Sequence, residues 1–73
     1  MTVNENIKTM RERAGMSQAE LSRKIDISQP FLNRIERGKK KPTLDMAIET
    51  AKVFGCTIDE LVYGGQPKEG GVQ

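Results

Sequence analysis

The 73-residue sequence has no histidine, no tryptophan and a single cysteine, Cys56. One cysteine excludes an internal disulfide, and without histidine it leaves too few of the ligands that a zinc site needs. The absence of histidine also removes the commonest acid–base group of enzymes, and no residue pattern marks a lysine that could replace it. The sequence therefore argues against an enzyme and predicts neither a metal site nor a cofactor. We interpret Cys56 as a structural residue or one without a role.

Long apolar runs are absent as well, which excludes a membrane span and a signal peptide. With no disulfide to require an oxidising compartment, we expect a cytoplasmic protein. Only three residues are aromatic, and no alternating apolar run reaches the length of a strand. A chain this short forms one small domain, with room for a core but not for a closed pocket or a separate ligand domain. We therefore expect no small-molecule ligand.

The charges present are unevenly distributed. Residues 1–41 carry ten Lys and Arg against five Asp and Glu, a balance of +5, whereas residues 42–73 carry two Lys against five acids, a balance of −3. A basic half joined to an acidic half suggests a side that faces a polyanion. An ordinary solvated surface would also fit, so the charge alone does not choose between these two interpretations.

Apolar spacing and capping residues predict five helical segments and no strand. The first runs from about Asn4 to Ala14, with Val3, Ile7, Met10 and Ala14 as its apolar positions and Gly15 as its end. The second follows Ser17, which forms a predicted capping box with Glu20, and carries Leu21 and Ile25. The third follows Ser28, has Pro30 in its first turn, and carries Leu32 and Ile35 before Gly38.

The second half of the sequence holds the two remaining segments and a tail. Thr43 caps a fourth helix that Gly55 ends, with the apolar positions Leu44, Ala47, Ile48, Ala51 and Phe54. Thr57 caps a short last helix with Ile58 and Leu61. The predicted fold is all-α, a compact five-helix bundle over residues 1–63. Residues 64–73 are polar and glycine-rich, which predicts a flexible tail.

Residues 18–37 contain the most informative pattern, two short helices joined by a tight turn. The inward face of this pair requires apolar residues where Leu21, Ile25, Ile27, Leu32 and Ile35 occur. Ser22 is small, which allows the two helices to approach closely. The other face of the third segment is rich in groups that can contact base edges and phosphates, namely Gln29, Pro30, Phe31, Asn33, Arg34 and Arg37.

At these residues the chain resembles the Cro-type helix-turn-helix repressors, which are XRE-like and have a lambda-repressor-like fold. The resemblance extends from about Ile7 to Leu61, and its most specific strings are MSQAEL at 16–21, IERGK at 35–39 and KPT at 41–43. It implies a transcriptional regulator whose third helix enters the major groove of double-stranded DNA, usually as a homodimer on two half-sites. One position departs from the family pattern: Asp26 stands in the turn where glycine is usual, and Asp tolerates positive φ better than most residues.

The resemblance and the chemistry of the side chains together suggest residue roles. Gln29 should reach a base edge, with adenine the best match for its carboxamide, and Arg34 should contact a guanine or a phosphate. Pro30 shapes the helix start and could meet a thymine methyl, while Phe31 either touches a methyl or sugar or packs onto a neighbouring turn. The predicted phosphate contacts are Gln18, Asn33, Arg37, Lys39, Lys40 and Lys41.

The resemblance also places Arg11 and Glu36 together at the seam between the first and third helices. A carboxylate on the phosphate-facing side would repel DNA, and a guanidinium can neutralise it through two parallel hydrogen bonds. We therefore expect a partly buried ion pair; the alternative is two free surface charges of little energetic value.

Two other interpretations of the same fold stay open. An antitoxin or a restriction-control protein would bind DNA in the same way, and sequence does not separate these roles from a general regulator. The fold could instead serve as a protein-interaction module that has lost DNA binding. The basic first half and the polar face of the third segment speak against that last interpretation.

Overall fold

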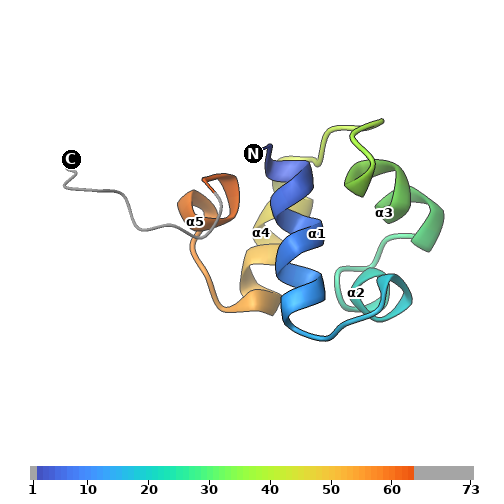
Figure 1. Cartoon of the computed structure of the whole chain (residues 1–73), viewed down its shortest axis with the longest axis horizontal. Helices are drawn as coiled ribbons and strands as arrows, with labels where there is room; N and C mark the ends of the chain where they lie inside the picture. Colours follow the sequence, from blue (N-terminus) through green and yellow to red (C-terminus); the bar gives the residue numbers. More distant parts are fainter. Residues whose placement is uncertain (1, 64–73) are drawn as a thin grey trace, which may run out of the picture.

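The computed structural model describes residues 2–63, which form five helices and no strand. In Figure 1, α1 runs through the middle of the molecule with α4 behind it, α2 and α3 on one side and α5 on the other. The predicted all-α five-helix bundle is confirmed. The predicted tail, residues 64–73, lies outside the described residues. The helices are α1 (Val3–Arg13), α2 (Gln18–Lys24), α3 (Gln29–Glu36), α4 (Leu44–Phe54) and α5 (Ile58–Val62).

Each helix begins after a hydroxyl residue whose side chain accepts the backbone N–H three positions on. Such caps satisfy N–H groups that the helix itself cannot pair, and each contributes about 1 kcal/mol. The predicted capping box at Ser17 is half right: Ser17 accepts from the Glu20 N–H, but Glu20 does not return a bond. Full two-way boxes, which the sequence analysis did not predict, form at the starts of α1 and α5. The caps are Thr2, Ser17, Ser28, Thr43 and Thr57.

The core gathers apolar side chains from all five helices. Its buried members are Ile7, Leu21, Ile25, Leu32, Ile35, Met46, Ala47, Ala51 and Leu61. The apolar positions predicted on α4 are partly wrong, because Leu44 is 70% exposed while Met46 and Thr50 are buried. The buried stripe of α4 runs through residues 46, 47, 50 and 51, and Leu44 falls about 90° from its middle. Ala14, expected on the inner face of α1, is the exposed C-cap of that helix.

Asp26 adopts the left-handed conformation that the turn between α2 and α3 requires, with φ of 59°. The Ile27 N–H donates to the Ser22 carbonyl at 3.0 Å and the Asp26 N–H to the Arg23 carbonyl at 3.4 Å. These two bonds close α2 in a Schellman motif, whose left-handed residue is most often glycine. The prediction of positive φ at Asp26 is confirmed.

Asp26→Gly should raise the free energy of unfolding by about 0.5 kcal/mol. Glycine relieves the strain that a non-glycine residue has at positive φ, which is roughly 1 kcal/mol. This gain exceeds the free-energy cost of the extra conformational entropy that glycine loses on folding. Urea denaturation would measure the change. The matched control is Asp26→Ala, which removes the same charge but keeps a Cβ and should be destabilising. Equal effects of the two substitutions would contradict the strain argument.

Candidate nucleic-acid interface

The two helices of the central unit pack closely, which positions the outer face of α3. Leu21, Ile25, Leu32 and Ile35 are buried, and Ile27 packs against them half-buried. The small Ser22 is buried between the helices, and its hydroxyl donates to the Ala19 carbonyl at 2.9 Å. The inward set predicted from residues 18–37 is therefore the set that the structure uses, and Gln29, Pro30 and Arg34 of α3 are exposed on its outer face.

Six of the predicted DNA-contact residues line one shallow open depression between the start of α2 and the outer face of α3. They are Gln18, Gln29, Pro30, Asn33, Arg34 and Arg37. The set combines three carboxamides and two guanidinium groups with no acid among the lining residues. Such a surface can donate and accept hydrogen bonds at base edges, and its positive charge suits phosphates.

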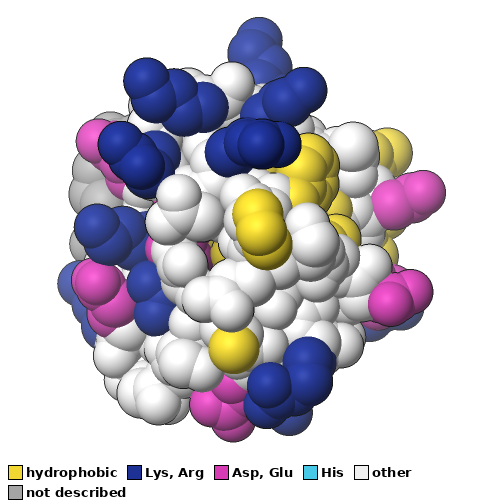
Figure 2. Space-filling model, turned by 90° about the vertical axis from the view of Figure 1, so that its right-hand side faces the viewer, with side chains coloured by type: hydrophobic (Ala, Val, Ile, Leu, Met, Phe, Trp, Pro, Cys, Tyr) yellow, Lys and Arg dark blue, Asp and Glu magenta, His cyan; other side chains and the backbone are white. Residues whose placement is uncertain are grey.

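Basic side chains border this face. Figure 2 shows the side of the molecule that carries α2 and α3, with Lys and Arg gathered along its upper and left margins and also at its lower edge. The middle is mainly uncharged side chains and backbone, with a few apolar side chains among them. Lys39, Lys40 and Lys41 are exposed in the loop after α3 and do not line the depression. The polar centre and the basic margins therefore occupy one side of the molecule.

Phe31 is placed differently from the other residues of α3 that were expected at bases. Its side chain is half-buried and packs against the hydrophobic core, and it is not among the residues that line the depression. The structure thus shows the packing of Phe31 onto neighbouring residues, and its contact with a base or sugar stays a prediction. Pro30 is exposed and lines the depression.

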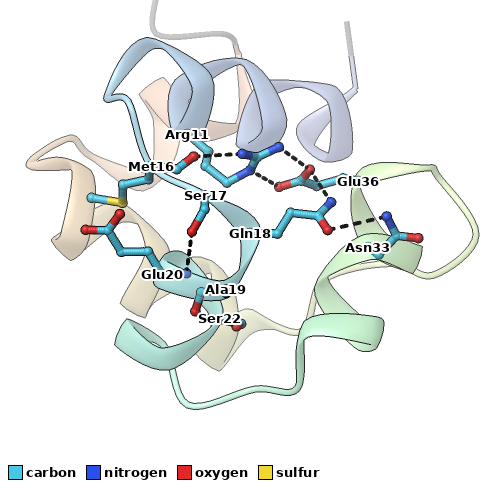
Figure 3. A network of polar contacts seen from close by, with 9 residues as sticks. All are labelled: Arg11, Met16, Ser17, Gln18, Ala19, Glu20, Ser22, Asn33 and Glu36. Atoms are coloured by element: carbon cyan, nitrogen blue, oxygen red, sulfur yellow. Dashed lines mark hydrogen bonds and ion pairs between the residues drawn. The ribbon is translucent and has the colours of Figure 1, made fainter.

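Arg11 and Glu36 form a bidentate ion pair at the seam between α1 and α3. Arg11 Nε donates to Glu36 Oε2 at 2.7 Å, and Arg11 Nη2 donates to Glu36 Oε1 at 2.9 Å. The side chains are 11% and 1% exposed. Arg11 Nη1 also donates to the Met16 carbonyl at 2.8 Å (Figure 3). The hydrogen bond to Glu36 outweighs burial and raises the pKa of Arg11.

The ion pair continues into the depression through side chains that the sequence interpretation did not connect. Gln18 Nε2 donates to Glu36 Oε1 at 3.0 Å, and Asn33 Nδ2 donates to Gln18 Oε1 at 3.5 Å (Figure 3). Glu36 is thus linked to two of the residues predicted to contact DNA. Pattern reasoning had no signal for these bonds, because their partners lie 15 and 18 positions apart in the chain.

Asn4 is a second residue that the sequence interpretation missed. Its Nδ2 donates to the Ile35 carbonyl at 2.8 Å and to the Lys40 carbonyl at 2.7 Å. These bonds attach the end of α3 and the lysine loop to the first turn of α1. The loop is therefore held in place on one side of the molecule, although its lysine side chains are exposed.

Cys56 lies half-buried beside the core, away from the depression. Burial, aided by the Glu60 carboxylate, raises the pKa of the Cys56 thiol. A raised pKa favours the unreactive thiol over the thiolate. Among residues 2–63, no cluster of three or more Cys, Asp or Glu side chains is arranged to hold a metal ion. Within the same residues, no helix has the length and apolar character needed to cross a membrane.

Comparison with known proteins matches residues 7–61 to the helix-turn-helix family. An uncharacterized HTH-type transcriptional regulator of Archaeoglobus fulgidus is 34% identical over 55 residues, covering 75% of this chain and 79% of that protein. The regulator y4dJ of Sinorhizobium fredii is 33% identical over 60 residues, covering 82% and 78%. The P22 c2 repressor, solved with a synthetic operator, has the same fold, with a TM-score of 0.79 at 23% identity over 88% of this chain and 97% of that one. The family match spans most of the chain and agrees with the strings at 16–21, 35–39 and 41–43, so this chain belongs to the helix-turn-helix family.

Proposed function

We propose that this protein binds double-stranded DNA sequence-specifically and acts as a repressor-like regulator of transcription. The observation that supports the proposal best is the depression on α2 and α3, where carboxamide and guanidinium groups meet on one face with basic residues at its margin. The major groove admits an α-helix, and these side-chain types match the hydrogen-bonding groups of base edges. The relatives named as transcriptional regulators agree with this function.

Within this proposal the residues of the face divide by chemistry. Gln29, Pro30 and Arg34 lie at exposed positions of α3 and line the depression, so we assign them to base edges. The cations after α3 suit phosphates, because a phosphate contact needs charge and reach more than a fixed geometry. Gln18, at the first position of α2, joins them through its amide. The phosphate set is then Gln18, Arg37, Lys39, Lys40 and Lys41.

We further propose that two copies bind together on DNA, as a homodimer with α3 of each copy in successive major grooves. One exposed recognition helix of eight residues reaches only a few base pairs, and a twofold arrangement doubles the length of DNA that is read. The half-sites should lie about 34 Å apart, one turn of the duplex. A location in the reducing cytoplasm agrees with DNA as the partner and with the free thiol of Cys56.

Selection of bound duplexes from a random pool tests sequence-specific binding, half-site symmetry and spacing together. Recovery of one enriched motif, repeated with twofold symmetry, is the expected result. A pool that shows no enrichment after several rounds, although the protein stays folded, would overturn sequence-specific binding. A single unrepeated motif would overturn only the dimer.

The affinity for the selected duplex should fall steeply with salt. Each phosphate neutralised by Lys or Arg contributes a slope of about −0.9 in log K against log salt concentration. Lys40→Ala should reduce that slope by roughly 1 per protomer and should weaken all duplexes by the same factor, because phosphates carry no base information. Fluorescence anisotropy at a series of salt concentrations measures both quantities.

Lys52→Ala is the matched control for this experiment, since Lys52 is an exposed cation on α4, outside the α2–α3 unit. It should leave the slope unchanged. An affinity that is indifferent to salt, or a Lys52 effect equal to that of Lys40, would contradict the proposed phosphate contacts.

A further inference from the structure

Asn33 is held by a one-way chain of hydrogen bonds that starts at the buried carboxylate of Glu36. A carboxylate only accepts hydrogen bonds, so Gln18 must turn its NH2 group, and not its oxygen, toward Glu36. The Gln18 oxygen then faces Asn33, which in turn must offer its own NH2 group. Glu36 thereby fixes the orientation of two successive carboxamides whose O and N ends would otherwise be interchangeable.

The outcome of this chain is that the Asn33 oxygen Oδ1 points away from Gln18 (Figure 3). Asn33 is half-buried and lines the same depression as Gln29 and Arg34. Its outward groups are one acceptor, Oδ1, and the second hydrogen of Nδ2. An oxygen presented to a phosphate would be repelled, since phosphate oxygens are themselves acceptors. Of these two groups only the second hydrogen of Nδ2 suits the phosphate contact expected from the sequence, and that contact would leave Oδ1 without a donor.

One acceptor beside one donor is the pattern that matches adenine in the major groove, where N6–H donates and N7 accepts. Guanine presents two acceptors, O6 and N7, and would require the opposite orientation of the carboxamide, with its NH2 group outward. We propose that Asn33 is a specificity-determining residue that favours adenine over guanine, and that Glu36 and Gln18 act as positioning residues that set its orientation. This inference rests on the proposed binding of duplex DNA by α3.

The quantity that tests the proposal is the ratio of affinities for matched duplexes that carry adenine or guanine at one position of the half-site. Wild-type protein should prefer adenine at one position by roughly 5-fold or more, the discrimination of a bidentate base contact. Asn33→Ala should reduce that ratio to about one, while Gln18→Met should reduce it partly, because Asn33 can then turn over. A role in stability or in phosphate binding would lower both affinities equally and leave the ratio unchanged.

Lys40→Ala is the control, since an exposed lysine of the loop should weaken both duplexes without changing the ratio. Circular dichroism of each variant, all changed outside the core, verifies the fold before titration. If Asn33→Ala leaves the adenine-to-guanine affinity ratio at its wild-type value at every position of the half-site, the assignment of Asn33 is overturned. A ratio that Asn33→Ala removes but Gln18→Met preserves would overturn the positioning role. If wild-type protein binds no duplex at all, the failure belongs to the proposed function.

Discussion

Glu36→Ala should lower the free energy of unfolding by about 3–5 kcal/mol, the cost of removing one partner of a buried ion pair. The Glu36 side chain is 1% exposed and accepts from Arg11 and from Gln18, so its loss leaves a buried guanidinium without its counter-charge. A domain of this size has a total stability of only about 3–10 kcal/mol. The melting temperature should therefore fall by more than about 12 °C, measured by circular dichroism.

Glu49→Ala is the matched control, because Glu49 pairs with Lys52 at 3.5 Å on the surface, with both side chains more than half exposed. An exposed pair of this kind is worth less than about 1 kcal/mol. Glu36→Ala and Glu49→Ala remove the same charge, so the difference between them isolates the effect of burial. If both variants melt within a few degrees of the wild type, the pair between α1 and α3 is not structurally important.

The double variant Arg11→Met/Glu36→Leu should recover much of the loss, because apolar replacement of a buried ion pair is often neutral. The structure sets a limit to this recovery. The Met16 carbonyl loses the bond from Arg11 Nη1, and Gln18 loses its acceptor. A double-mutant cycle measures the coupling directly, and purely additive effects of the two substitutions would contradict an interaction between them.

Gln29→Ala and Arg34→Ala should each relax base preference at one or two positions of the half-site. The loss on the preferred sequence should be roughly 1–3 kcal/mol if the removed contact is bidentate. Both residues are exposed, so neither substitution should change the stability of the fold by more than about 0.5 kcal/mol. Repeating the selection from a random duplex pool with each variant measures the change base by base.

The two variants should alter different positions of the motif, since Gln29 and Arg34 lie in successive turns of α3. They should also differ in salt dependence, because only Arg34 carries charge. Motifs identical to the wild-type motif for both variants would mean that α3 is not the helix that reads the bases. In that case the depression could still bind phosphates, and the salt experiment would separate the two results.

The sequence by itself determined the local structure of this protein. Helix starts are marked by Ser17, Ser28, Thr43 and Thr57. Each hydroxyl accepts a hydrogen bond from a backbone N–H only three residues further on, so the signal is local in sequence. Glycines that take positive φ after α1, α3 and α4 mark the ends for an equally local reason. The outward face of α3 followed from helical spacing once its inward residues were known. The family was likewise identified from short strings whose spacing the sequence shows directly.

The tertiary structure decided which side of an ambiguous helix is buried and how polar side chains are oriented. Leu44 and Met46 are both apolar, and only the packing of α4 against the rest of the bundle placed Met46 inside and Leu44 outside. The half-buried position of Phe31 against the core was likewise set by packing. The orientation of Asn33 depends on Gln18 and on a carboxylate held by Arg11, three elements brought together only when the chain folds. A carboxamide has nearly the same shape either way round, so its orientation depends on neighbouring donors and acceptors that no local pattern records.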